Sequence, residues 1–332
     1  MKYITAVPVT TAVILKIEEA KAFFHLGGFW KKPIAGGAWS GTISTHQQEL
    51  NLRTWALANG WNGTSAATIT VDAGVYIWSD NTATPALTIN GSWPGGITLV
   101  NNGYIIGRGS NANSGGAAGT AVELAVGATI NSASGYIAGG GGGGGTAVGF
   151  TTAGGGGGAG GGEGGNGYQA DLTSPAAGGI GGTVGLIGSN GLSGSSAGGG
   201  GGRILPGTGG IGPSSITSDW SGAHGRGGGS GGSGGSASFG AYYAYGGSGG
   251  SGSLGGSTPT NTGAYGKFND IAGGGGGGGW GALGGYGSIC GDGGTNAAMG
   301  NPGSGGKAVA LNGNTVTWVG GFPSTKVFGA VS

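Results

Sequence analysis

Apolar and polar positions alternate along the chain between Thr68 and Ile130, which is the pattern of half-buried β-strands. Asn90-Gly91 and Asn102-Gly103 interrupt the alternation with residue pairs that are typical of tight turns. The segments between turns are short and rich in β-branched and aromatic residues: Thr68–Ser79, Ala86–Asn90, Ile97–Val100, Tyr104–Ile106 and Val122–Ile130. Short strands in this succession predict either a compact sandwich or a short β-helix.

A helix is expected before this β-rich stretch and a hairpin near the end of the chain. Residues Ser44–Gly60 fit one helix, with Ser44 or Thr45 as its N-cap and Gly60 at its C-terminal end. Residues Ala308–Val319 fit a closing hairpin around Asn312-Gly313. We expect this tail to pack on the β-rich stretch, so that the two segments form one base.

Glycine dominates the region between these two segments. Most of the 96 glycines lie between Gly135 and Gly306, and composition alone would favour a flexible coil. The glycines are patterned, however: Ser230, Ser233 and Ser236 are separated by glycine pairs, and other runs are pure glycine. A period of three is that of the polyproline-II helix, and glycine allows such backbones to pack closely. The pattern predicts a bundle of polyglycine-II helices, and the presence of only ten prolines excludes collagen.

Aromatic residues gather in the segments between the glycine runs. A rigid scaffold that presents Tyr, Trp, Ser and Gly in its loops has the composition of an antibody paratope. The candidate contact residues of this kind are Phe150, Tyr168, Trp220, Tyr242, Tyr243, Tyr245, Tyr265 and Phe268. The alternative is that about half of them only cover the ends of the bundle.

The glycine runs resemble those of the distal long-tail-fibre adhesins of T-even phages. The resemblance is carried by AGGGGGGG at Ala138–Gly145, AGGGGGAGGG at Ala153–Gly162, GGGGG at Gly198–Gly202, GRGGGSGGSGGS at Gly225–Ser236 and AGGGGGGGWGALGG at Ala272–Gly285. It implies a polyglycine-II sandwich whose loops contact the host outer membrane. The expected function is that of a tail-tip adhesin in the virion, which binds a bacterial outer-membrane protein or a surface glycan. A homotrimer and a monomeric cap both stay open.

The expected fold class is therefore mostly irregular and β: a β-rich base followed by a bundle of polyglycine-II helices with loops at its ends. The expected domains are a virion-attachment segment (1–41), a helix with the β-rich base (42–134), the receptor-binding bundle (135–306) and C-terminal strands on the base (307–332). The first segment would dock onto another tail protein through its aromatic residues, which are Phe23, Phe24, Phe29, Trp30 and Trp39. Local packing of these residues on the β-rich stretch is an equal alternative.

Composition narrows the function classes. A net charge of +1, with 7% charged residues, gives no electrostatic footprint for nucleic acid. Cys290 is the only cysteine, so neither an internal disulfide nor a cysteine metal site is expected. Ser218, Asp219, Ser221 and His224 lie close in sequence, but nothing in the sequence orients them as a catalytic set. No enzyme activity, cofactor or metal is expected.

Two other functions compete with the adhesin. The first is a structural fibre or hub-cap protein that makes no contact with a receptor. The second is an ice-binding protein, because some antifreeze proteins also use polyglycine-II bundles. Ice binding needs a flat, regular face of small residues, and the irregular aromatic loops fit that requirement poorly.

Overall fold

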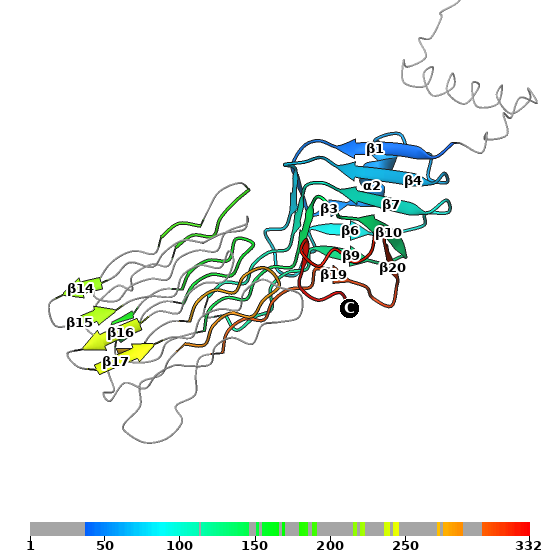
Figure 1. Cartoon of the computed structure of the whole chain (residues 1–332). Coiled ribbons are helices and arrows are strands. Elements are labelled where there is room, and N and C mark those ends of the chain that lie inside the picture. Colours follow the sequence, from blue (N-terminus) through cyan, green and yellow to red (C-terminus); the bar gives the residue numbers. More distant parts are fainter. Residues whose placement is uncertain are drawn as a thin grey trace, which may run out of the picture.

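Figure 1 shows the computed structural model of the chain. The structure describes residues 37–112, 114–145, 155–165, 179–184, 188–190, 275–287 and 301–332. It also describes the backbone of short strands between residues 151 and 272, whose bounds are given below.

The main body is a parallel β-solenoid with three faces, each of which is one sheet. The first sheet contains β1 (Trp39–Ile43), β4 (Ala67–Val71), β7 (Ile97–Asn101), β10 (Ala128–Asn131) and β20 (Val316–Trp318). The second contains β2 (Gln47–Gln48), β5 (Tyr76–Trp78), β8 (Tyr104–Ile106), β11 (Tyr136–Ala138) and β21 (Val327–Phe328). The third contains β3 (Leu50–Asn51), β6 (Leu87–Ile89), β9 (Val122–Leu124) and β19 (Val309–Ala310).

Each turn of the coil adds one strand to each sheet, until the glycine-rich region interrupts it. The strand triplets β1–β2–β3, β4–β5–β6 and β7–β8–β9 make three uninterrupted turns. The next turn begins with β10 and β11, and its third strand is β19, which pairs in parallel with β9. The whole stretch from Gly139 to Ala308 is therefore an excursion out of one solenoid turn, and the chain returns to the sheet position that it left open.

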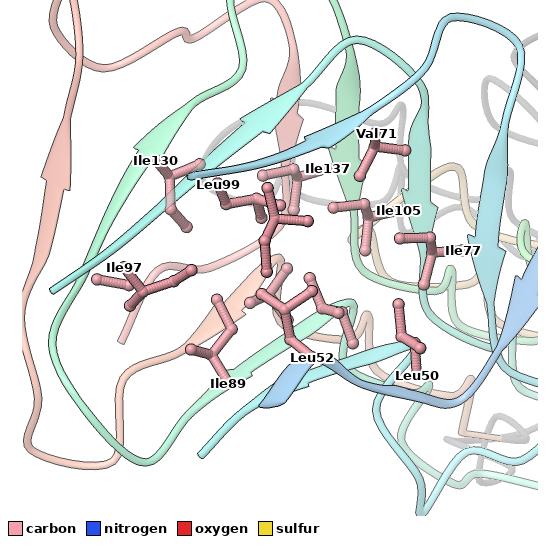
Figure 2. Packing of buried hydrophobic residues seen from close by; sticks show 14 of the residues in the cluster. Leu50, Leu52, Val71, Ile77, Ile89, Ile97, Leu99, Ile105, Ile130 and Ile137 are labelled. Atoms are coloured by element: carbon pink, nitrogen blue, oxygen red, sulfur yellow. The ribbon is translucent and has the colours of Figure 1, made fainter. Parts of the chain in front are cut away.

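Alternation of buried and outward positions along each strand builds the core. In β4, for example, Ala67, Ile69 and Val71 are buried while Thr68 and Thr70 lie on the outer face. Figure 2 shows apolar side chains from different turns meeting inside the coil, among them Leu52, Ile77, Ile89, Leu99 and Ile105. A period of two is the natural signal of such strands, because successive side chains point to opposite faces.

One buried polar residue fixes a corner of the coil. Asn101 is fully buried, and its side-chain amide nitrogen donates to Ser132 Oγ at 3.0 Å and to the Tyr136 carbonyl at 3.1 Å. Its side-chain oxygen accepts from the Gly103 backbone N–H. These bonds satisfy a polar group that would otherwise be costly to bury, and they tie the third turn to the fourth.

The fold class predicted from the glycine pattern is wrong. The architecture is a parallel β-solenoid, and α2 (Leu52–Ala58) is the one helix among the described residues. The described glycine runs form neither helix nor strand, so they do not appear as the predicted polyglycine-II helix bundle. The glycine pattern could not predict the fold, because the glycine runs belong only to the excursion. The strands before and after the excursion form one continuous solenoid.

Two local predictions were also wrong. The predicted helix over Ser44–Gly60 is only α2, whose N-cap is Asn51, because the preceding residues form β2 and β3 and bury Leu50 against the core. The predicted hairpin at Asn312-Gly313 is absent from the tail, which the structure describes fully. β19 and β20 lie in different sheets, each parallel to a strand of the body.

Backbone groups hold the described glycine runs together. Gly141 N donates to Ala159 O, and Gly144 N donates to Gly156 O three residues along the run. Gly142 and Gly145 donate in the same way to Ala282 and Gly285. The segments lie so close that any side chain would collide: a Cβ built at Gly142 would lie 1.7 Å from Gly303 O. Glycine is required here because its backbone atoms are the packing surface.

Candidate receptor-binding region

Four of the predicted contact residues lie in one antiparallel sheet. This sheet has the order β14 (Ser215–Thr217), β15 (Trp220–Gly222), β16 (Ser236–Phe239) and β17 (Tyr242–Tyr245). Trp220 begins β15, whereas Tyr242, Tyr243 and Tyr245 belong to β17. The pairing register sets Trp220 opposite Thr217 and Tyr242 opposite Phe239. The pairing of β15 with β16 thus brings together two segments that the sequence separates by a glycine run.

The other predicted contact residues do not join this sheet. Tyr168 begins β13 (Tyr168–Gln169), which pairs with β12 (Thr151–Thr152), and β12 pairs in turn with β18 (Ile271–Ala272). Phe150, Tyr265 and Phe268 lie outside the described residues.

Figure 1 places the four-stranded sheet at the end of the molecule that is remote from the solenoid. The described glycine segments, drawn in green and orange, run side by side from the solenoid toward it. The molecule therefore has one end formed by the solenoid and another end formed by β14–β17. A sheet at a free end is well placed to meet a partner.

The excursion is anchored to the solenoid by Trp280. This residue comes from the glycine segment 275–287, is 3% exposed, and packs on Tyr136 and Phe328 at ring distances of 5.9 and 5.6 Å. Ala138 belongs to the same buried cluster, and its small side chain leaves room on the outer face of the second sheet. Next to it, Gly281 N donates to Gly139 O at 2.8 Å. An aromatic side chain thus locks two glycine runs against the solenoid.

A ladder of stacked rings continues from this anchor across the second sheet. Tyr104 stacks on Tyr76 at 4.7 Å and on Tyr136 at 5.4 Å, with interplanar angles of 8° and 2°. Lys326 lies over the Tyr136 ring at 4.0 Å, and His46 contacts the Tyr76 ring at 5.3 Å. Parallel pairing in register produces the ladder, because equivalent positions of successive turns lie side by side.

Sequence reasoning missed both the ladder and the anchor. A signal for the ladder was present, because the dipeptide Tyr-Ile recurs as Tyr76-Ile77, Tyr104-Ile105 and Tyr136-Ile137. In each copy Ile points into the core while Tyr lies on the outer face. Trp280 carries no such signal, since it stands alone between glycines and its partners come from the solenoid.

The predicted attachment residues fall mostly outside the described residues: Phe23, Phe24, Phe29 and Trp30. Trp39 is half-buried at the start of β1, and its ring meets that of Trp55 edge-on at 6.3 Å. Trp39 also packs against the solenoid core. Its contacts within the chain are therefore local ones, made at the first turn of the coil.

The described part of the chain holds no cluster of His, Cys, Asp or Glu that could bind a metal ion. It also contains no helix with the length and apolarity that crossing a membrane requires. Four residues that lie close in sequence were considered as a catalytic set: Ser218, Asp219, Ser221 and His224. The structure describes only the backbone of Ser221, and the other three lie outside the described residues.

Comparison with known proteins gives one family. The family model for the phage tail fibre adhesin Gp38 matches residues 39–226, which is more than half of the chain. The match begins at the first residue of β1, so it covers the three uninterrupted solenoid turns as well as much of the glycine-rich excursion. No curated protein and no solved structure matches the chain.

Proposed function

Because the chain belongs to the Gp38 family of phage tail fibre adhesins, we propose that it recognises a bacterial surface receptor through the end formed by β14–β17. Membership of this family places the protein in the virion tail fibre and implies binding to a host surface receptor and to other tail components. The proposed role is non-enzymatic. The finer assignment concerns which end of the molecule makes the host contact and which residues carry it.

The remote position of the aromatic sheet is the observation that carries this proposal. Strands β15 and β17, which contain Trp220 and the tyrosines, lie at the end remote from the solenoid (Figure 1). Tyr and Trp provide large contact areas at low entropic cost, which is why they are enriched in binding surfaces. The described glycine segments run from the solenoid toward this sheet and are joined to one another by backbone hydrogen bonds, which supports a preorganised contact surface.

Replacement of the β16–β17 hairpin tests the proposal. We expect that exchanging Ala237–Tyr245 for the corresponding segment of another adhesin abolishes saturable binding to host cells, because the contact surface is removed. The melting temperature should stay nearly unchanged, since the solenoid core is not involved. The measurement is binding of the purified full-length protein to host cells in competition with phage adsorption.

A matched control comes from the solenoid. Phe322 is 43% exposed and follows β20, a solenoid strand that Figure 1 shows far from β14–β17, so Phe322→Ser removes an exposed ring of the solenoid. This variant should bind cells as the unmodified protein does. Unchanged cell binding after the hairpin exchange would sink the proposal and favour a structural fibre or hub-cap role. Loss of folding would show that the hairpin is structural.

We also propose that the segment before β1 attaches the protein to another tail component. Its candidate anchors are Phe23, Phe24, Phe29 and Trp30, which precede the first solenoid turn. This arrangement would leave the opposite end of the molecule free for the host. Deletion of residues 1–36 should then prevent incorporation into the virion while host-cell binding by the purified protein is retained.

A further inference from the structure

We propose that a pocket beside the solenoid binds an uncharged, hydroxyl-rich ligand, a saccharide unit, at a site separate from the β14–β17 sheet. The pocket has a volume of about 490 Å³ and is lined by Asp80, Asn81, Thr82, Arg108, Ser110, Asn111, Ser114, Gly116 and Ala117. Volumes of this size are typical of small-molecule sites. Its lining is mainly polar, which suits a ligand that carries many hydrogen-bonding groups.

The pocket has rigid walls. On one side, Ser79 Oγ accepts from Asn81 N and shares its single proton between Asn81 O and Glu49 Oε1, which fixes the loop that carries Asp80 and Thr82. On the other side, Ser110 Oγ accepts from Gly143 N at 2.7 Å, so the first glycine run supports that wall. The backbone loop of the first wall and the Ser110 side chain of the second are thus held in place before a ligand arrives.

Asn111 extends the second wall. Its side-chain oxygen accepts from the Glu163 backbone N–H at 3.0 Å, and its amide nitrogen donates to Glu163 Oε2 at 3.3 Å. Ser114 Oγ donates to the Asn111 carbonyl at 2.7 Å. These bonds tie the pocket wall to the second glycine segment, and they occupy Asn111 and Glu163 with each other.

The Arg108 guanidinium is a hydrogen-bond donor that the residues of the pocket walls do not engage. Its guanidinium is half-buried, and burial lowers its pKa, while the charges of Glu163 and Asp80 act in the opposite direction. Within the described part of the chain its guanidinium makes no hydrogen bond. Gly161 gives it room, because a Cβ there would lie 2.7 Å from Arg108 Nη1. A partly desolvated donor without an acceptor gains free energy from a ligand that supplies one.

The charges of the pocket select the ligand class. Asp80 faces the same space as Arg108, and Glu163 lies close enough to affect Arg108, so a free anion meets two carboxylates for one guanidinium. A guanidinium can only donate and a carboxylate can only accept. A ligand that satisfies both must carry acceptors and donors side by side. Neighbouring hydroxyl groups of a saccharide do so, because each hydroxyl both donates and accepts.

The test measures saccharide binding by the full chain. D-glucose, D-galactose and N-acetyl-D-glucosamine are titrated one at a time and followed by saturation-transfer NMR, and an uncharged O-antigen oligosaccharide represents the polymeric source. We expect at least one monosaccharide to bind with a Kd of about 1 mM, as befits a small ligand held by a few hydrogen bonds. Tighter binding of the oligosaccharide would identify the cell-surface polymer as the source.

Paired variants locate the site. Asp80→Asn and Arg108→Lys should each weaken binding by about tenfold. The first replaces a carboxylate with a neutral amide that keeps only one acceptor oxygen, and the second removes the planar donor fork. Asp72→Asn and Arg53→Lys make the same chemical changes outside the pocket and should leave the Kd unchanged. Asp80 is exposed and has no hydrogen bond from its side chain among the described residues, so Asp80→Asn tests the site even if Arg108→Lys fails to fold.

Three results would overturn the proposal. The first is the absence of saccharide binding by folded protein at concentrations about tenfold above the expected Kd. The second is binding that both pocket variants retain, and the third is displacement of the saccharide by inorganic phosphate, which would indicate an anion site. Exchange of Ala237–Tyr245 should not affect binding in this pocket, so the outcome is independent of the proposed receptor contact.

Discussion

At the scale of single residues, the chain uses aromatic rings for positioning at the solenoid surface. The rings of Tyr76, Tyr104 and Tyr136 stack along the second sheet, and Trp280 packs onto the last of them. The ladder therefore leads directly to the point where the glycine segments attach. Its stability should affect the attachment of the excursion as well as the solenoid itself.

Removal of the central ring tests this role. We expect Tyr104→Ala to lower the free energy of unfolding by about 2 kcal/mol, because it breaks two stacked contacts on a half-buried ring. Tyr104→Phe keeps the rings stacked and should cost little. The measurement is chemical denaturation of both variants. Equal destabilisation by Ala and Phe would show that the hydroxyl group, not the stack, is what matters.

At the scale of elements, the glycine runs replace side-chain packing with backbone contact. Gly142 donates to Ala282 O and accepts from Gly278 N, and its Cα faces the Gly303 carbonyl. Each such residue joins several segments at once. The pure composition of the runs follows from this crowding, because there is no open side on which a methyl group could point.

A single methyl group should therefore disrupt this element. We expect Gly142→Ala to lower the free energy of unfolding by at least about 3 kcal/mol, because its Cβ would overlap a backbone oxygen that cannot rotate away. Gly127→Ala is the matched control, since its Cβ would meet Thr315 Oγ1 at 3.4 Å in a loop. The measurement is the melting temperature of each of the two variants. Equal melting temperatures would contradict tight backbone packing at Gly142.

The strands of the solenoid could be predicted from the sequence, but their arrangement could not. Alternation identified the segments that became β4 to β10, because period-two patterning reports directly which positions face a core. A short β-helix was one of the two architectures that this pattern predicted. The helix over Ser44–Gly60 was wrong because local propensity cannot reveal that Leu50 pairs with Leu87 in the next turn.

The candidate sites were only partly accessible to sequence reasoning. The aromatic segments of the excursion were visible as departures from glycine, whereas their assembly into β14–β17 depends on pairing between segments. Arg108 gave no signal, because its neighbours Asp80 and Glu163 come from other turns and segments. A solenoid brings together residues of neighbouring turns. The number of residues between them in the sequence varies with the length of each loop, so no fixed spacing reveals such a site.

At the scale of the whole molecule, the tail completes a body that the excursion interrupts. β19, β20 and β21 each cover a strand that precedes or opens the excursion: β9, β10 and β11. Val309 and Val327 are fully buried, so these short strands also close the core. The N-terminal strands and the tail therefore depend on each other, although about half of the chain separates them.

Deletion of the tail should accordingly unfold more than the tail. We expect a chain that ends at Gly306 to lose its cooperative thermal transition, because Ile130 and Ile137 lose the strands that pair next to theirs. Exchange of Ala237–Tyr245 is the control, since it alters the excursion and keeps the tail. Circular dichroism during heating distinguishes the two. A soluble truncated chain with the original melting temperature would mean that the solenoid turns before the excursion fold independently of the strands after it.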